Sequence, residues 1–214
     1  MRVADHIIKV DPVHPDTAAI NKAADCVKQG GLIVFPTWCF YGIGADAFHE
    51  KAVNRVFQIK ERTYAKPLLI LIKGKESLKK YVLDVPESAK ILMDRFWPGK
   101  LTLVFHSNDT IPEYLTSGTG KIGIRVPENR IARALLSCLD HPLTGTSANI
   151  SGISGCSDIK TLDINIRDNV DLVLDSGKLK GKKGSTVVDI TCDPPIILRE
   201  GSISEPEIRK CLEK

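Results

Sequence analysis

The sequence lacks several features that would place it in a common class of protein. It has no unbroken apolar stretch of the about 18 residues that a membrane-spanning helix requires, and its start lacks the long apolar core of a signal peptide. Six cysteines are present without any Cys-x-x-Cys pair, so neither a zinc site nor a disulfide framework is indicated. We therefore expect a cytoplasmic protein with reduced thiols and no membrane segment.

Common catalytic motifs are missing as well. The patterns GxxxxGK[ST], GxSxG and HExxH do not occur, and the five histidines show no ligand spacing. Acid–base catalysis through a recognisable triad is therefore not indicated. The net charge of +4 is too small to indicate nucleic-acid binding, but it is compatible with an anionic ligand if the cations gather in one cleft.

The chain has 214 residues, of which 43% are hydrophobic, so it can bury a full core. We predict one domain over residues 1–214, because strand and helix patterns alternate along it without a repeat. Several connections are too short for a crossover helix, which favours an α/β fold whose twisted sheet mixes parallel and antiparallel strands between flanking helices. The expected helices span 16–29, 50–59, 86–96, 130–139, 162–168 and 204–212, and the expected strands 6–10, 32–35, 68–72, 101–105, 122–126, 172–174, 185–189 and 196–201. Residues 37–44 are expected to form a glycine-containing loop.

The segment 142–152 combines a short apolar start with a run of small or hydroxylated residues. Such side chains have too little apolar area to fill a core, so we expect the segment to act through its backbone amides and short donors. A phosphate would suit these donors, which are Thr144, Thr146, Ser147, Asn149 and Ser151. A polar turn whose hydroxyls cap its own backbone explains the segment equally well.

Cations and hydroxyls recur at the ends of the expected elements. They are Lys60, Arg62, Lys66, Arg125 and Arg199, beside Thr37, Ser147, Asn149 and Ser185. Taken singly, each lysine or arginine is more often a solvated surface residue. Together they favour a basic ligand cleft for a polyphosphate, because phosphoryl and nucleotidyl transfer depend on charge neutralisation more than on proton transfer.

Seven short motifs then occur in a characteristic order from about residue 15 to residue 203. They are FPT with YGIG (35–44), KER with KPL (60–68), WPG (97–99), IRVP (124–127), TSANISG (146–152), STVVD (185–189) and LREG (198–201). In this order they resemble the YrdC/Sua5 family, in its short, single-domain form. The resemblance implies ATP-dependent synthesis of L-threonylcarbamoyl-AMP from threonine, bicarbonate and ATP, with release of pyrophosphate. The product would feed the t6A modification at position 37 of tRNA.

The same resemblance implies roles for individual residues. The implied catalytic residues are Lys60, Arg62, Ser147 and Asn149. The implied ATP-binding residues are Arg62, Lys66, Lys121, Ser147 and Arg199. The implied threonine-binding residues are Thr37, Cys39, Arg125 and Ser185. Mg²⁺ is expected to enter with the ATP phosphates rather than through a protein metal site, and the implied partners are downstream tRNA threonylcarbamoyl-transfer proteins, with tRNA or double-stranded RNA as a further candidate.

One departure from the family pattern concerns the amino-acid pocket. Trp38 and Cys39 stand where the family usually has an acidic residue and a threonine, so we expect a bulkier and less polar pocket wall. Two alternatives stay open at this point. The first is an RNA-binding YrdC-like module without synthase activity, and the second is a paralogue that acts on another amino acid.

Overall fold

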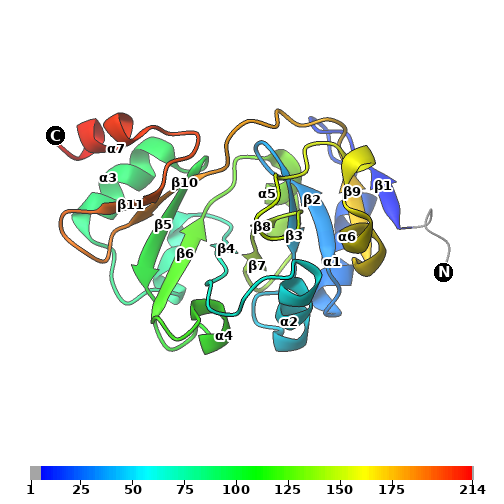
Figure 1. Ribbon diagram of the computed structural model, residues 1–214, viewed down its shortest axis with the longest axis horizontal. Helices are drawn as coiled ribbons and strands as arrows, with labels where there is room; N and C mark the ends of the chain where they lie inside the picture. The colour runs from blue at the N-terminus through cyan, green and yellow to red at the C-terminus, as the bar shows by residue number, and fades with distance from the viewer. Residues whose placement is uncertain (1–5, 214) are drawn as a thin grey trace.

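The computed structural model describes residues 6–213, and its strands form two sheets that lie side by side (Figure 1). The first sheet has the order β1 (Ile7–Lys9), β9 (Leu172–Asp175), β2 (Ile33–Pro36), β3 (Tyr41–Gly44) and β8 (Thr146–Ser147). The second has the order β11 (Ile196–Arg199), β10 (Thr186–Asp189), β5 (Leu101–His106), β6 (Lys121–Arg125), β4 (Ile70–Leu71) and β7 (Leu143–Thr144). Both contain parallel and antiparallel pairs, so the predicted mixed pairing is confirmed, with the strands divided between two sheets instead of one.

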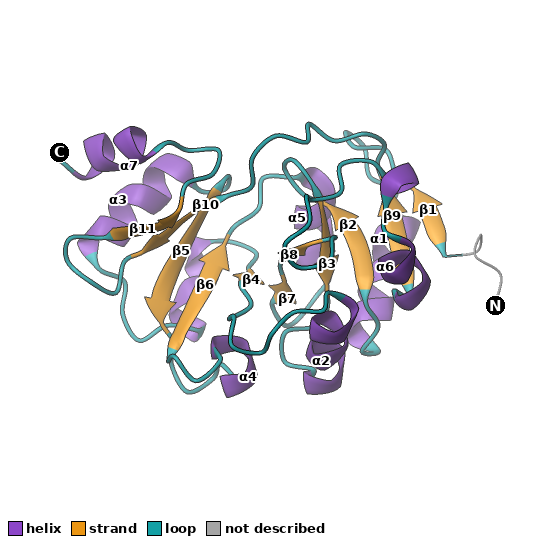
Figure 2. Ribbon diagram, in the orientation of Figure 1, coloured by secondary structure: helices purple, strands orange, loops and turns teal. Residues whose placement is uncertain are grey.

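Helices flank both sheets (Figure 2). They are α1 (Thr17–Lys28), α2 (Glu50–Ile59), α3 (Glu87–Phe96), α4 (Glu113–Thr116), α5 (Arg130–Ser137), α6 (Ile164–Asn169) and α7 (Glu205–Leu212), with short 3₁₀ helices at Lys75–Lys80 and Ile159–Thr161. The six expected helices are all present, whereas α4 and the two 3₁₀ helices, of three to six residues, were not predicted because one or two turns are too short to show a periodic apolar pattern. Within residues 6–213, no helix combines the length and apolar character needed to cross a bilayer.

The first sheet is covered on both faces, because successive residues of its central strand point to opposite sides. Ile33 and Phe35 of β2 are fully buried in a cluster with residues of α1 and α5. Val34, between them, is buried in the other cluster, with residues of α2 and α6. The uninterrupted apolar run of β2 follows from this double burial.

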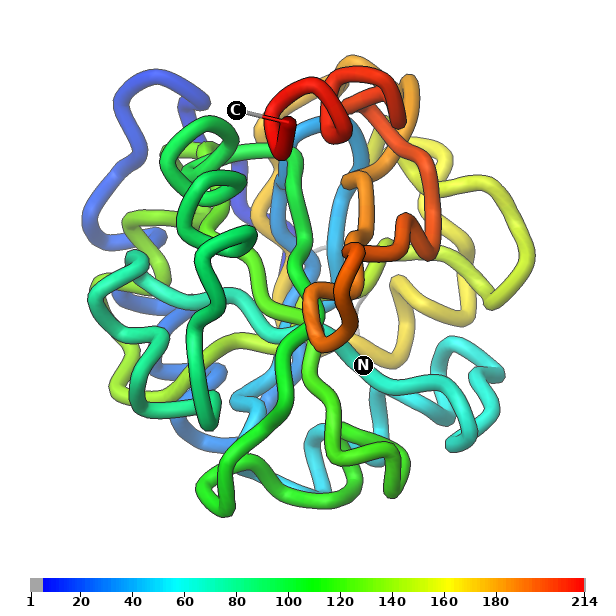
Figure 3. The backbone as a smooth tube through the Cα atoms, turned by 90° about the vertical axis from the view of Figure 1, so that its left-hand side faces the viewer, coloured from blue at the N-terminus to red at the C-terminus, as the bar shows by residue number. Residues whose placement is uncertain are grey.

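The second sheet uses its two faces differently. Leu103 of β5 and Ile124 of β6 are buried in the core with residues of α3 and α7, and Figure 3 shows α7 packed beside α3. The alternate residues Thr102, Val104 and Arg125 line a cavity on the other side. The pleat of these strands therefore separates the core from a ligand-accessible surface.

The expected loop over residues 37–44 is wrong in its second half, which forms strand β3 antiparallel to β2. A tight turn closes this hairpin, with the Thr37 amide 3.1 Å from the Phe40 carbonyl oxygen. Glycines in β3 suggested a loop, but they are required for packing. A Cβ on Gly44 would lie 2.8 Å from the Phe35 ring and 2.9 Å from the Leu143 side chain.

A long connection from β9 to β10, residues 176–185, joins the two sheets across one edge of the molecule (Figure 1). We call it the strap. The buried Tyr41 hydroxyl donates to the Gly177 carbonyl at 2.6 Å, and the Gly181 amide donates to the Cys39 carbonyl at 2.9 Å. These bonds hold the strap against the β2–β3 turn, so that its end at Lys183 reaches the cavity.

Candidate functional site

A cavity of about 710 Å³ is lined by residues of both sheets. Its walls come from the β2–β3 turn, the segment after α2, strands β5, β6, β8, β10 and β11, and the end of the strap. The cationic residues in the lining are Arg62, Lys121, Arg125, Lys183 and Arg199, and the carboxylates are Asp189 and Glu200. Arg62 and Arg199, which are 137 positions apart in the sequence, therefore border one space.

Arg125 is the most unusual group in this cavity. It ends strand β6 with only 8% of its surface exposed, and its Nε and Nη2 atoms have no hydrogen-bond partner within residues 6–213. Burial lowers the pKa of this guanidinium, while the nearby Cys39 and Glu128 act in the opposite direction. A buried cation without paired donors is costly, so the site is electrostatically prepared for an anion.

Ser185 lines the same cavity as Arg125, and both its hydroxyl and its carbonyl already form hydrogen bonds within the protein. Its hydroxyl lies 2.9 Å from the Thr102 hydroxyl, and the Arg199 guanidinium donates to the Ser185 carbonyl at 2.8 Å and to the hydroxyl at 3.2 Å. Arg199 is thus oriented by the backbone at the end of the strap, directly before β10. Its position on the edge strand β11 leaves part of the guanidinium at the cavity.

Cys39 lines the cavity and is buried, as the prediction of a threonine-pocket residue requires. Burial raises the pKa of its thiol, against the opposing effects of Arg125, Arg199 and Lys100. The group is therefore a neutral thiol at neutral pH. Thr37 also lines the cavity, but its hydroxyl donates to the Phe40 carbonyl at 2.6 Å. The hydroxyl proton is therefore used within the turn, and only the oxygen can still accept a hydrogen bond.

Trp38 does not form the cavity wall, which corrects the expectation of a bulkier pocket. The Lys100 ammonium lies 3.4 Å from the centroid of its ring and the Lys180 ammonium lies 4.3 Å from it. Lys100 precedes β5 of the second sheet, and Lys180 belongs to the strap. The indole is therefore an anchor between the two sheets, held by cation–π contacts.

The four residues predicted as catalytic lie together but do not face the same way. Arg62 and Ser147 line the cavity. Lys60 is 2% exposed and donates from Nζ to the carbonyls of Ser147 and Asn149, and it does not line the cavity. The Asn149 side-chain amide donates to the Ile150 and Ile153 carbonyls at 2.8 and 2.6 Å.

The segment 142–152 also differs from the expectation that it stays out of the core. Thr144 and Ala148 of the small or hydroxylated run are buried, and the Thr144 hydroxyl accepts a hydrogen bond from the Ala45 amide at 2.9 Å. Sequence composition missed this because a hydroxyl is easily buried when a backbone group satisfies it. Thr146 and Ser147 remain at the cavity, as predicted for ligand donors.

Arg62 supports the loop that follows it. Its guanidinium donates to the Lys66 and Pro67 carbonyls at 3.2 and 2.8 Å. Burial, and next the charge of Arg199, lower the pKa of Arg62, so these two cations repel each other across the cavity. Lys66 is exposed and does not line the cavity, so its nucleotide contact stays a prediction.

Lys121 lines the cavity and forms an ion pair with Asp189 at 2.9 Å. Asp189 also accepts from the Thr191 amide and hydroxyl at 2.9 and 2.5 Å. Within residues 6–213, no group of three or more His, Cys, Asp or Glu side chains could hold a metal ion. Asp189, Glu200 and Lys183 were not predicted, although the lysine-rich segment before β10 was a usable signal for Lys183.

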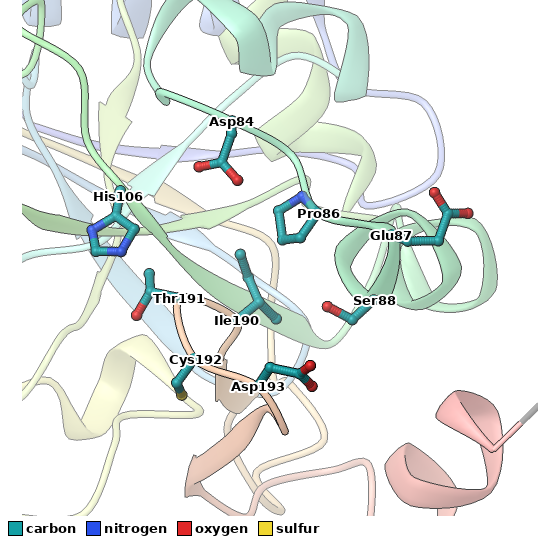
Figure 4. Close-up of a pocket in the computed structure, with 9 residues that line it drawn as sticks. All are labelled: Asp84, Pro86, Glu87, Ser88, His106, Ile190, Thr191, Cys192 and Asp193. Carbon is teal, nitrogen blue, oxygen red and sulfur yellow. The ribbon is translucent and has the colours of Figure 1, made fainter.

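A second pocket, of about 380 Å³, lies where β5 and β10 end (Figure 4). Its lining residues are Asp84, Pro86, Glu87, Ser88, His106, Ile190, Thr191, Cys192 and Asp193. None of the residues predicted for catalysis or binding belongs to it. The predicted residues that do line a cavity all converge on the larger one.

The structure is an α/β fold with a cavity between two mixed sheets, lined by a buried guanidinium whose Nε and Nη2 atoms find no hydrogen-bond partner within residues 6–213. The family model for Sua5, YciO and YrdC proteins, described as telomere recombination, matches residues 25–201. The chain therefore belongs to the Sua5/YciO/YrdC family.

Individual relatives agree with this assignment. A threonylcarbamoyl-AMP synthase from Pyrococcus abyssi is 36% identical over 193 residues, which are 90% of this chain and 57% of the relative. The crystal structure of P. abyssi Sua5 complexed with L-threonine is similar with a TM-score of 0.91 and 35% identity, over 96% of this chain and 60% of that chain. Escherichia coli YciO gives a TM-score of 0.84 and 31% identity over 92% of this chain and 95% of that one.

Proposed function

We propose that this chain is an ATP-dependent L-threonylcarbamoyladenylate synthase, a nucleotidyltransferase that acts as a single domain over residues 1–214. Support comes from family membership and from the P. abyssi relative that carries this name. The chain spans 57% of the length of that relative.

The observation that carries the proposal is the buried Arg125 guanidinium in the cavity, whose Nε and Nη2 atoms have no hydrogen-bond partner in the described part of the chain. A guanidinium offers forked donors that match a carboxylate, and burial strengthens such a pair. We assign the threonine carboxylate to Arg125, with Thr37, Cys39 and Ser185 around the rest of the amino acid. The structure of P. abyssi Sua5 complexed with L-threonine supports an amino-acid site in this fold.

The remaining cations would hold the nucleotide. Arg62, Lys121 and Arg199 line the cavity with Ser147, and Arg199 lies close enough for its charge to lower the pKa of Arg62, after the larger effect of burial. A polyphosphate between them would relieve this repulsion. Lys183 is added to this set because it lines the same cavity, while Lys66 stays a candidate that would have to move toward it.

The proposed reaction has two steps. The threonine amine bonds to the carbon of bicarbonate with loss of water, which gives a carbamate. A carbamate oxygen then attacks the α-phosphorus of ATP, the bond from that phosphorus to the β-bridging oxygen breaks, and pyrophosphate leaves with the electron pair. The cavity's part is to hold the carbamate in line and to stabilise the charge on the leaving group.

Mg²⁺ bound to the ATP phosphates would supply further charge neutralisation. Asp189 is committed to Lys121 and Thr191, which fits a cation that enters with the phosphates better than one held by protein carboxylates. The product would pass to tRNA threonylcarbamoyl-transfer proteins for t6A formation. A cytoplasmic location, bicarbonate as the carbon source and RNA contact also stay predictions.

The proposal is tested by pyrophosphate release from the purified chain with MgATP, bicarbonate and a panel of amino acids, together with mass spectrometry of the adenylate. We expect release that requires both L-threonine and bicarbonate. His106→Gln, in the second pocket, serves as a control that leaves turnover unchanged.

Other outcomes would identify the alternatives. Preferential release with another amino acid would replace threonine as the substrate. Binding of double-stranded RNA that falls steeply with salt, without any amino-acid-dependent pyrophosphate release, would favour an RNA-binding module.

A further inference from the structure

We propose that Lys60 is a positioning residue, whose charge fixes the loop 147–153 for an anionic ligand instead of contacting that ligand itself. Anion affinity at Ser147 then depends on whether Lys60 is protonated. This inference rests on the proposed function in taking the anion to be a polyphosphate, and it assigns Lys60 a role different from that of Arg62.

The contacts of Lys60 point toward the loop. Lys60 caps the C-terminus of α2, and its Nζ donates to the Ser147 carbonyl and, at 2.6 Å, to the Asn149 carbonyl. In the reverse direction, the Ser151 amide donates to the Lys60 carbonyl at 2.9 Å. These bonds connect α2 to the loop at three places, across more than 80 positions of sequence.

The loop depends on this connection. On its other side it is held to β3, where Ser147 pairs with Gly42 and the Ala148 amide donates to the Tyr41 carbonyl at 2.8 Å. Without the Lys60 ammonium, the Asn149 carbonyl would lose its hydrogen-bond donor, whereas the Ser147 carbonyl would keep the Asn149 amide at 2.9 Å. The cost of an unsatisfied buried carbonyl would then arise next to Ser147, which lines the cavity.

The electrostatic surroundings make the ammonium sensitive to an anion. Lys60 is nearly inaccessible, and burial, with a further contribution from Arg62, lowers its pKa to about 8. No carboxylate in residues 6–213 lies within salt-bridge distance of it, and the adjoining Glu61 is exposed. An anion at Arg62 and Ser147 would favour the charged form of Lys60.

Anion affinity and the protonation of Lys60 should rise together. Near pH 8 about half of the free molecules carry a neutral Lys60, so anion binding draws in a proton. Affinity for the anion should then decrease by up to about 10-fold per pH unit above pH 8, until Lys60 is neutral in the complex as well. Below about pH 7 the ammonium is charged in both states, and this source of pH dependence disappears.

The direct experiment is an NMR titration of the lysine ¹³Cε signals of the full chain, with and without inorganic pyrophosphate. Lys60→Arg identifies the Lys60 signal by its loss. We expect one lysine to titrate near pH 8 in the free protein and at clearly higher pH with pyrophosphate. A Lys60 signal whose midpoint is the same in both samples would overturn the proposal.

Pyrophosphate binding by calorimetry supplies the second readout. Lys60→Met should weaken binding at pH 7 by about 10- to 100-fold, the size expected for one charge at close range in a partly screened site. Lys60→Arg keeps a permanent charge, so its affinity at pH 9 should exceed that of Lys60→Met. Lys51→Met, an exposed lysine of the same helix, should behave as wild type, and this comparison cancels the titration of pyrophosphate itself.

Equal affinities for wild type and a folded Lys60→Met protein would also refute the positioning role. These measurements involve no turnover, so they separate the two proposals. Active synthase without proton-linked binding would overturn only the role of Lys60. Proton-linked binding in a chain without synthase activity would overturn only the proposed function.

Discussion

Arg125→Met is expected to separate ligand binding from fold stability. A carboxylate on the guanidinium would receive two charge-assisted hydrogen bonds, each contributing about 1.5–3 kcal/mol. Their loss amounts to about 3–6 kcal/mol, which corresponds to L-threonine binding that is about 10²- to 10⁴-fold weaker.

The same substitution should not reduce the stability of the fold. Nε and Nη2 of Arg125 make no hydrogen bond within residues 6–213, and burial already disfavours the charge. Methionine keeps most of the apolar volume, so we expect the free energy of unfolding to stay within about 1 kcal/mol of wild type or to rise.

Two measurements on wild type and Arg125→Met test this prediction. Calorimetry with L-threonine gives the affinity, and urea unfolding gives the stability. Arg133→Met, an exposed arginine of α5, is the matched control and should change neither quantity. Threonine affinity within about 3-fold of wild type in Arg125→Met, less than the about 1.5 kcal/mol of a single such bond, would refute the placement of the carboxylate.

Three further predictions follow from the same structure. Cys39→Thr should raise the ratio of kcat/KM for threonine to kcat/KM for valine. A pocket that hydrogen-bonds the substrate hydroxyl rejects an analogue without it by ~10⁴-fold, whereas an apolar pocket separates near-isosteres by only ~10²-fold. An unchanged ratio would mean that Cys39 does not face the substrate. Arg62→Ala should lower turnover by at least ~10²-fold at saturating ATP while changing the unfolding free energy by less than about 1 kcal/mol; retained turnover would argue against transition-state stabilisation by Arg62. Tyr41→Phe should cost about 1–3 kcal/mol of stability in urea unfolding, because the Gly177 carbonyl and the Ser176 amide lose a buried partner; an unchanged midpoint would mean that the strap is held elsewhere.

Local patterns account for the elements that sequence reasoning placed well. Helix α2 occupies the expected residues 50–59, because Ala52, Val53, Val56 and Phe57 recur at helical spacing and are all buried. Strand β3 was missed for the complementary reason. Its glycines have poor strand propensity, and only the close approach of Phe35 and Leu143 explains why Gly44 is there.

Some site residues could be proposed from local sequence, whereas the roles of others depend on distant contacts. Arg125 could be proposed from the sequence because it ends an alternating strand before a proline, and Ser147 because it lies in a run of short donors. Lys60 and Arg62 look equivalent in a motif two positions apart. Their different directions depend on the β8 loop, which belongs to a segment more than 80 residues away.

By itself, the sequence determined the kind of each long element, the mixed pairing and the family, because periodicity, turn residues and ordered motifs are properties of neighbouring residues. Only the tertiary structure decided that the strands form two sheets, that Trp38 contacts both Lys100 before β5 and Lys180 of the strap, and that Lys60 supports a loop behind the cavity. These features depend on which distant groups satisfy each buried charge and hydrogen bond, and that pairing exists only once the chain has closed on itself.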